Sequence, residues 1–204
     1  MQAQMRMLMA GSKDLAFTLD VSGSMSGTFI HQCRTSINEI IDSHCGQNDL
    51  VALLVFDNTV RQVFDWTFAT DGQKAVMRNL VNNDTRIGGS TAFWDALVAT
   101  ARRMAKVKDH KGRSLWICTL TDGGDNASRS TSTSVIAELK KLPQVGLIAI
   151  TVGVLSNEAE IRRVCEASRN RGLFIRAEAS GQGIQTAFRA AIQHMEDYAV
   201  QQFT

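Results

Sequence analysis

Short apolar runs alternate with helical patterns along nearly the whole chain, and this alternation restricts the possible fold more than any other feature. Four of the runs are apolar at successive positions rather than at every second one: residues 14–19, 49–56, 114–121 and 145–154. Strands of that kind are covered on both faces, as in a parallel sheet between two layers of helices. The pattern therefore predicts an α/β fold with a doubly wound, mainly parallel central sheet, Rossmann-like, with helices on both faces.

Amphipathic helices are predicted between these runs, where apolar residues recur at helical spacing. The segments concerned are 29–44, 71–81, 92–107, 134–142, 157–168 and a closing helix at 184–195. Asn157 stands where a side chain can cap the fifth of these helices. Residues 60–64 alternate between apolar and polar, which predicts one short antiparallel strand at the sheet edge, and residues 173–177 predict a last short strand.

The chain has the size and composition of one soluble domain. Its 204 residues are 44% hydrophobic and 21% charged, which is enough apolar material for one sizeable core. We assign residues 13–204 to this domain and residues 1–12 to an N-terminal linker or tail. No run approaches the ~18 apolar residues of a membrane span. A net charge of +2 does not favour nucleic acid as a partner, and the basic residues within 102–113 are expected to form a solvated helix end.

The cysteines favour a reducing compartment. None of the four, Cys33, Cys45, Cys118 and Cys165, belongs to a C-x-x-C pair. Cys33 and Cys45 fall on one predicted helix about 18 Å apart, at 1.5 Å per residue, which is too far for a disulfide. Because free thiols persist where disulfides are kept reduced, we expect a cytoplasmic, intracellular protein.

Oxygen-bearing side chains follow two of the predicted strands and open one predicted helix. Asp20, Ser22 and Ser24 follow the first strand at spacing i, i+2, i+4. Asp122 directly follows the third long apolar run, and Thr91 opens a helix after a pair of glycines. Because ligands of an open parallel sheet bind beyond the carboxyl ends of its strands, we expect these side chains to meet at one edge.

The chemistry of these side chains suits a metal ion. Oxygen-only ligands are typical of a hard divalent cation such as Mg²⁺, with Mn²⁺ or Ca²⁺ as alternatives. Only Asp20 and Asp122 can compensate the charge of the ion, because the hydroxyls are neutral. An ion held in this way can accept one more anionic ligand, and a Glu or Asp carboxylate of a partner protein would fit.

The pattern resembles the metal-ion-dependent adhesion site (MIDAS) of von Willebrand factor type A (vWA) domains. The resemblance lies in the D-x-S-x-S run at Asp20, in Thr91 after Gly-Gly, in Asp122-Gly after an apolar strand, and in the element order over about 14–198. It implies a non-enzymatic, cation-dependent protein-binding module, often part of a larger multidomain protein. It also implies a ligand set in which hydroxyls coordinate or closely approach the ion and carboxylates bind directly or through water: Asp20, Ser22, Ser24, Thr91 and Asp122.

Each piece also has a simpler interpretation. Asp20 and Thr91 could be helix caps, and Asp122 could belong to a turn. The convergence of all three on one edge favours the metal site. Met25 and Trp94, which flank the site, could be core residues or could form an apolar rim around the ion.

An enzyme is the alternative from a different class. A metal-dependent hydrolase acting on phosphate esters would use the ion as a Lewis acid. The sequence places no histidine, lysine or second carboxylate beside the site to act as a general base. Asp57 and Asp125, the other acidic residues near this edge, are expected to lie at the surface or behind the ligands.

Overall fold

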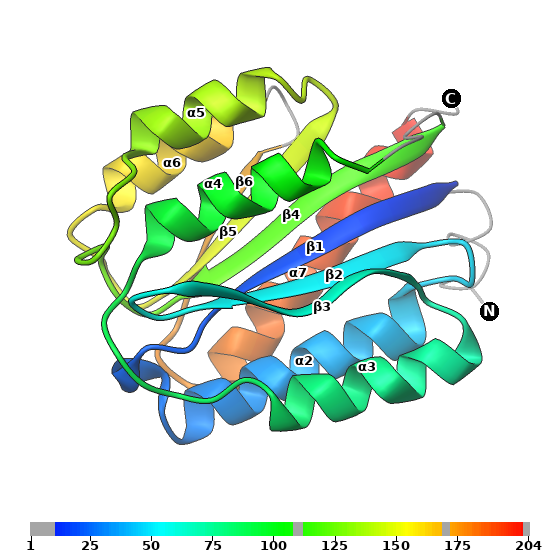
Figure 1. The fold of residues 1–204 in the computed structure, drawn as a ribbon, viewed down its shortest axis with the longest axis horizontal. Helices are drawn as coiled ribbons and strands as arrows, with labels where there is room; N and C mark the ends of the chain where they lie inside the picture. The colour runs from blue at the N-terminus through cyan, green and yellow to red at the C-terminus, as the bar shows by residue number, and fades with distance from the viewer. Residues whose placement is uncertain (1–10, 108–111, 169–171, 202–204) are drawn as a thin grey trace.

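The computed structural model of the protein describes residues 11–107, 112–168 and 172–201, so the predicted linker lies mostly outside the described residues. Six strands form one sheet with helices on both faces, which confirms the α/β prediction (Figure 1). The strands are β1 (Ser12–Asp20), β2 (Leu50–Phe56), β3 (Val60–Phe68), β4 (Arg113–Thr121), β5 (Val145–Val152) and β6 (Leu173–Ala177). Their order is β3-β2-β1-β4-β5-β6, and all neighbours are parallel except the antiparallel pair β2–β3.

The helices form two layers. They are α2 (Thr28–His44), α3 (Asp71–Asn83), α4 (Phe93–Met104), α5 (Ser132–Lys140), α6 (Glu158–Glu166) and α7 (Gly181–Gln201), with a single 3-10 turn, η1 (Gly23–Met25). Helices α2, α3 and α7 cover one face of the sheet, and α4, α5 and α6 cover the other (Figure 1). Among the described helices, none combines the length and the apolar character that a membrane crossing would need.

Strand β1 shows why its sequence is apolar without alternation. Leu15 and Phe17 belong to the core beneath α2 and α7, whereas Ala16 belongs to the core beneath α4. Thr18 also faces α4, where its hydroxyl lies 2.9 Å from the hydroxyl of Thr100. Both faces of the strand are therefore buried, as the run of apolar residues predicts.

The winding of the chain reverses beside β1. The chain passes from β1 through α2 to β2 on one side, and later returns through α3 and α4 to β4 on the other side of β1. The carboxyl ends of β1 and β4 therefore flank the switch point, where parallel α/β sheets bind ligands. Asp20 is the last residue of β1, and Thr121 is the last residue of β4.

Two predictions need correction. The edge strand β3 is longer than predicted and runs to Phe68, because it pairs with β2 as far as Leu50 across two register shifts. Asn157 does not cap α6: its side chain makes no capping hydrogen bond, and neither amide atom has a partner among the described residues. Its backbone (φ −101°, ψ 17°) lies outside the extended conformation that a capping residue adopts.

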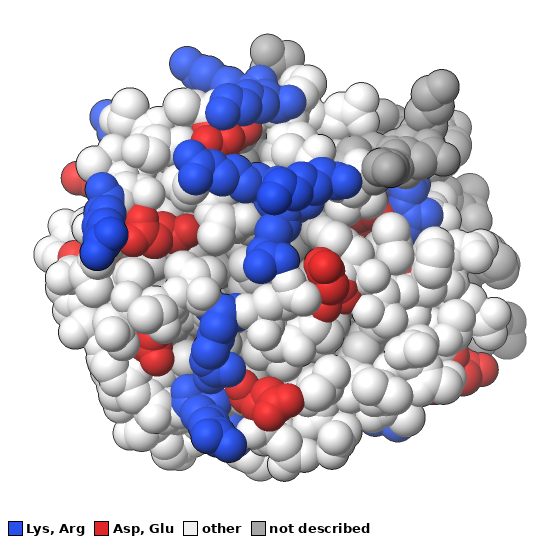
Figure 2. All heavy atoms as spheres, in the orientation of Figure 1, with Lys and Arg blue, Asp and Glu red and all other residues white. Residues whose placement is uncertain are grey.

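The basic residues near the end of α4 do not act as one group. Arg102 donates to Glu138 at 2.9 Å, whereas Arg113 is turned inward and its side chain is only 15% exposed. Lys108 and Lys111 lie outside the described residues. On the face seen in Figure 2, Lys and Arg side chains are interspersed with Asp and Glu.

All four cysteines are free, as predicted, and all four are buried. Burial raises the pKa of Cys45 to about 11 and the pKa values of Cys118 and Cys165 to about 12. These thiols are therefore protonated at neutral pH and behave as small core side chains.

Candidate metal centre

The loop after β1 and the loop after β4 are joined by their side chains at the carboxyl edge of the sheet. The backbone N–H of Ser22 donates to Asp20 Oδ1 at 2.8 Å, and the Ser22 and Ser24 hydroxyl oxygens are 3.2 Å apart. Ser24 Oγ donates to Asp122 Oδ1 at 2.7 Å, across 98 residues of sequence. Four of the five predicted residues thus form one continuous chain of hydrogen bonds.

Asp20 is fully buried, and its described contacts bring no positive charge to it. Ser22 N–H donates to one carboxylate oxygen, and Thr121 Oγ1 donates to the other at 2.5 Å. Burial raises the pKa of Asp20; hydrogen bonds from Thr121 and Ser22 lower it, and the charge of Asp122 raises it, so that the pKa lies above its ordinary value. Neutral donors alone hold this buried carboxylate.

Asp122 is in a similar electrostatic situation. Burial raises the pKa of Asp122, and the hydrogen bond from Ser24 lowers it only in part. Two neighbouring carboxylates with raised pKa values, linked by hydroxyl oxygens, fit a divalent cation in charge and in ligand type. Among the described residues, no group of three His, Cys, Asp or Glu side chains could hold a metal ion, so any site here depends on hydroxyl oxygens.

Thr91 lies just before α4, which begins at Phe93, and its side chain is nearly buried. Its backbone N–H donates to Asn126 Oδ1 at 2.8 Å, and its carbonyl accepts from Asn126 N at 3.0 Å. A Cβ atom on Gly123 would lie 3.2 Å from Thr91 Oγ1. Thr91 therefore presents its hydroxyl against the residue that follows Asp122.

The glycine pair before Thr91 connects this segment to the first loop. Gly88 N donates to Val21 O at 2.9 Å, and Gly23 N donates to Gly89 O at 3.3 Å. Gly89 has φ +76°, and a Cβ atom there would lie 2.4 Å from Asn58 Oδ1. Only glycine allows this close approach at position 89.

The structure thus brings all five predicted residues to one edge, and it also settles the roles of their neighbours. Met25 is fully buried and Trp94 is 5% exposed, so the interpretation of these two as an apolar rim is wrong. Asp125 supports α4, because its Oδ1 accepts from Trp94 N at 3.4 Å and from Ser128 Oγ at 2.5 Å. Asn126 was not predicted from the sequence, since an asparagine in a polar loop is typical turn chemistry.

Comparison with known proteins relates this architecture to one family. The family model described as von Willebrand factor type A domain matches residues 14–190. No curated protein sequence matches the chain.

Solved structures share the fold at low sequence identity. A von Willebrand factor type A protein from Catenulispora acidiphila has a TM-score of 0.74 and 17% identity, over 91% of this chain and 43% of that chain. Proximal thread matrix protein 1 from the mussel byssus, with a zinc-occupied MIDAS motif, has a TM-score of 0.73 and 20% identity, over 94% and 46%. The pilus adhesin SpaC from Lactobacillus rhamnosus GG has a TM-score of 0.71 and 14% identity, over 92% and 31%. The chain spans less than half the length of each.

Proposed function

The chain belongs to the von Willebrand factor type A family, and on that premise we propose that it is a divalent-cation-dependent protein-binding module. In this proposal the ion completes its coordination with an acidic residue of the partner. Domains of the family are generally adhesion and protein-interaction modules. The observation that carries the proposal is the pair Asp20 and Asp122, two carboxylates linked through Ser22 and Ser24 and, within the described part of the chain, met only by neutral donors.

The five residues would share two tasks in binding the ion. Asp20 and Asp122 would supply the negative charge, directly or through water, and Ser22, Ser24 and Thr91 would supply neutral oxygens. Bound Mg²⁺, or Mn²⁺ or Ca²⁺ in its place, supplies an electrophilic position that a carboxylate can fill. The buried hydrogen bonds on Asp20 keep its carboxylate in a fixed orientation before any ion arrives.

The metal half of the proposal is tested by titrating the protein with Mg²⁺ in a calorimeter. Wild-type protein is expected to bind one ion, and Asp122→Ala or Ser22→Ala is expected to abolish binding without unfolding the domain. Asp65→Asn, which changes an exposed carboxylate on β3, is the matched control and should bind normally. A wild-type protein that binds no ion would overturn the proposal.

The partner half is tested with acetate as the carboxylate probe. When Mn²⁺ is bound to the protein, the relaxation of water protons reports the waters that remain on the ion. Acetate is expected to displace one of them and to lower the relaxation rate. If acetate leaves the rate unchanged, the ion takes no outside carboxylate, and this half of the proposal fails.

A hydrolase would need a general base besides the two carboxylates assigned to the ion, and the described contacts do not provide one. The hydroxyls of Ser22 and Ser24 contact one another and Asp122, and no histidine or lysine among the described residues contacts them. Turnover of p-nitrophenyl phosphate that is lost in Asp20→Ala would instead favour the hydrolase.

An intracellular location is part of the same proposal. Its support is the four cysteines, which are buried and unbridged and would stay reduced in the cytoplasm. Fractionation of cells that produce the chain, with antibodies against it, tests this location, and recovery outside the cell would contradict it.

A further inference from the structure

Asn126 is bonded to both main-chain polar groups of Thr91. Its Oδ1 accepts from Thr91 N at 2.8 Å, and its own N–H donates to the Thr91 carbonyl at 3.0 Å. The N–H of Ala127 shares that carbonyl at 3.1 Å. The peptide on either side of Thr91 is therefore held by a loop that lies 35 residues further along the chain.

The same loop supplies caps that α4 lacks. Ala92, the residue at the cap position of α4, makes no side-chain capping bond. Instead, Asp125 Oδ1 accepts from Trp94 N at 3.4 Å and Ser128 Oγ accepts from Asp95 N at 3.0 Å. Free N–H groups of the first helical turn are thus satisfied from another segment. The loop after β4 and the start of α4 form one bonded unit.

Within this unit, only Asn126 offers a side-chain acceptor to Thr91. Ala92 N donates to Asp57 O at 2.7 Å and fastens the following residue to a different loop. Removal of the Asn126 amide would therefore leave the helix start in place but release Thr91 N–H. The hydroxyl of Thr91 would then be held less firmly against Gly123, although the Thr91 carbonyl keeps its two backbone hydrogen bonds.

We propose that Asn126 is a positioning residue for the metal centre, which acts by holding Thr91 so that its hydroxyl faces the ion. This inference rests on the proposed function, because it assigns a role to Asn126 through a ligand of the proposed ion. A ligand held in advance does not have to be ordered when the ion binds, so its affinity is higher.

The test compares three variants by Mg²⁺ calorimetry, together with the melting temperature of the metal-free protein. Asn126→Ala should weaken binding about threefold to tenfold, the effect of one lost hydrogen bond. Asn126→Asp keeps the Oδ1 acceptor and should restore affinity. Ser128→Ala, in the same loop, loses a bond to Asp95 but none to Thr91. It should lower the melting temperature with a smaller effect on affinity.

A double-mutant cycle with Thr91→Ala decides whether Asn126 acts through Thr91. In that background, Asn126→Ala should have no further effect on Mg²⁺ affinity. In metal-free protein, the Thr91 amide should exchange with solvent faster in Asn126→Ala than in Asn126→Asp. An unchanged affinity in Asn126→Ala, an equal loss in Ser128→Ala, or a full loss in the Thr91→Ala background overturns the role of Asn126. Wild-type protein without Mg²⁺ binding overturns the proposed function instead.

Discussion

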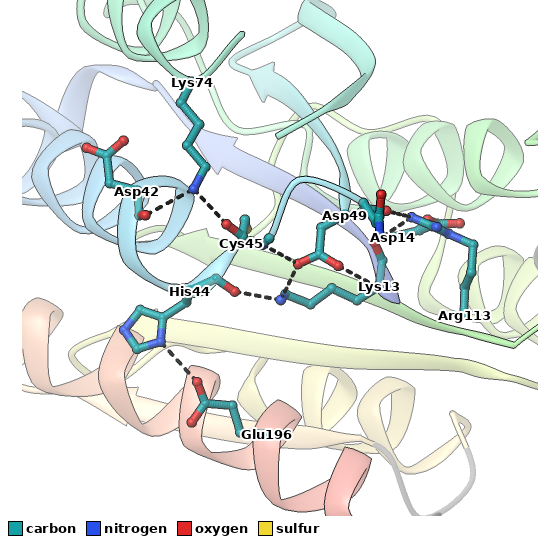
Figure 3. Close-up of polar contacts among 11 residues, drawn as sticks. Lys13, Asp14, Asp42, His44, Cys45, Asp49, Lys74, Arg113 and Glu196 are labelled. Atoms are coloured by element: carbon teal, nitrogen blue, oxygen red, sulfur yellow. Dashed lines mark hydrogen bonds and ion pairs between the residues drawn. The ribbon is translucent and has the colours of Figure 1, made fainter. Parts of the chain in front are cut away.

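Buried carboxylates at the amino end of the parallel strands face cations (Figure 3). Asp14 accepts from Arg113 Nε at 2.5 Å, and Asp49 Oδ2 lies 2.6 Å from Lys13 Nζ. Lys13 Nζ also donates to the carbonyl of His44, so the same cation satisfies the last turn of α2. Burial lowers the pKa of Lys13, but the negative groups facing it, Asp49 among them, raise the net pKa above its ordinary value.

At the carboxyl end, Asp20 and Asp122 are held by hydroxyl and backbone donors, and their pKa values are raised. Aspartate side chains therefore have different roles at the two ends of the strands. At the amino end, opposite charges hold the strands and α2 together. At the carboxyl end, the described contacts bring no protein cation to the negative charge, which costs stability and which the proposed divalent ion would offset.

The largest expected effect is the loss of stability when the ion pair at the amino end of the strands is removed. Arg113→Met removes the cation that faces fully buried Asp14 and should lower the free energy of unfolding by about 3–5 kcal/mol, because it breaks a buried ion pair by removing one partner. Urea unfolding measures this change. Arg102→Met is the control: its side chain is 64% exposed beside Glu138, and its loss should cost less than about 1 kcal/mol. Equal effects of the two variants would contradict the structural role of the amino-end pair.

The second largest expected effect is the stabilisation of the folded protein by Mg²⁺ bound at the carboxyl end. Mg²⁺ at one hundred times its dissociation constant should raise the free energy of unfolding by about 2.7 kcal/mol, because it binds only the folded protein. Thermal unfolding with and without EDTA measures the gain, which should be absent in Asp122→Ala. Arg113→Met should keep the gain in full, since sites at opposite ends of the sheet act independently. A gain that disappears with the amino-end pair would show that the two ends are coupled.

Replacing one carboxylate at each end should change stability in opposite directions. In metal-free protein, Asp20→Asn removes a buried charge that no described cation faces and should stabilise the fold by about 1 kcal/mol, because burial of an unpaired charge costs free energy. Asp14→Asn removes half of an ion pair and should destabilise it. Urea unfolding in EDTA compares the two variants. Destabilisation by both substitutions would mean that Asp20 already has a compensating charge within the protein.

Local burial made most of the fold predictable from the sequence. The runs that became β1 and β4 are apolar at successive positions because both faces of each strand are covered. The full length of β3 was not predictable, since its pairing opposite Leu50 and its register shifts depend on β2. The capping prediction for Asn157 failed for a similar reason: the backbone conformation at that residue is set by its surroundings, and residue type alone does not determine it.

The candidate site was predictable where its residues follow strand ends. Asp20 and Asp122 come directly after buried runs, and the spacing of Ser22 and Ser24 is visible in the sequence. Asn126 has no such signal, because its bond to Thr91 joins segments that no local spacing relates.

The smallest expected effect on stability concerns two glycines at the carboxyl end. A Cβ atom on Gly123 would lie 3.2 Å from Thr91 Oγ1, whereas a Cβ atom on Gly88 would meet nothing within 4 Å. Neither glycine has a positive φ, so alanine at either position should change the free energy of unfolding by less than about 1 kcal/mol.

Of these two substitutions, only Gly123→Ala should lower the affinity for Mg²⁺. Its methyl group must push the Thr91 hydroxyl away by a few tenths of an ångström. Mg²⁺ affinity should fall about threefold or more, the size of one weakened oxygen contact, while Gly88→Ala binds as wild type. Calorimetry on both variants measures the difference. Equal affinities would mean that the Thr91 hydroxyl does not serve the ion. The ligands of the proposed ion would then come from the loop after β1 and the loop after β4 alone, without Thr91.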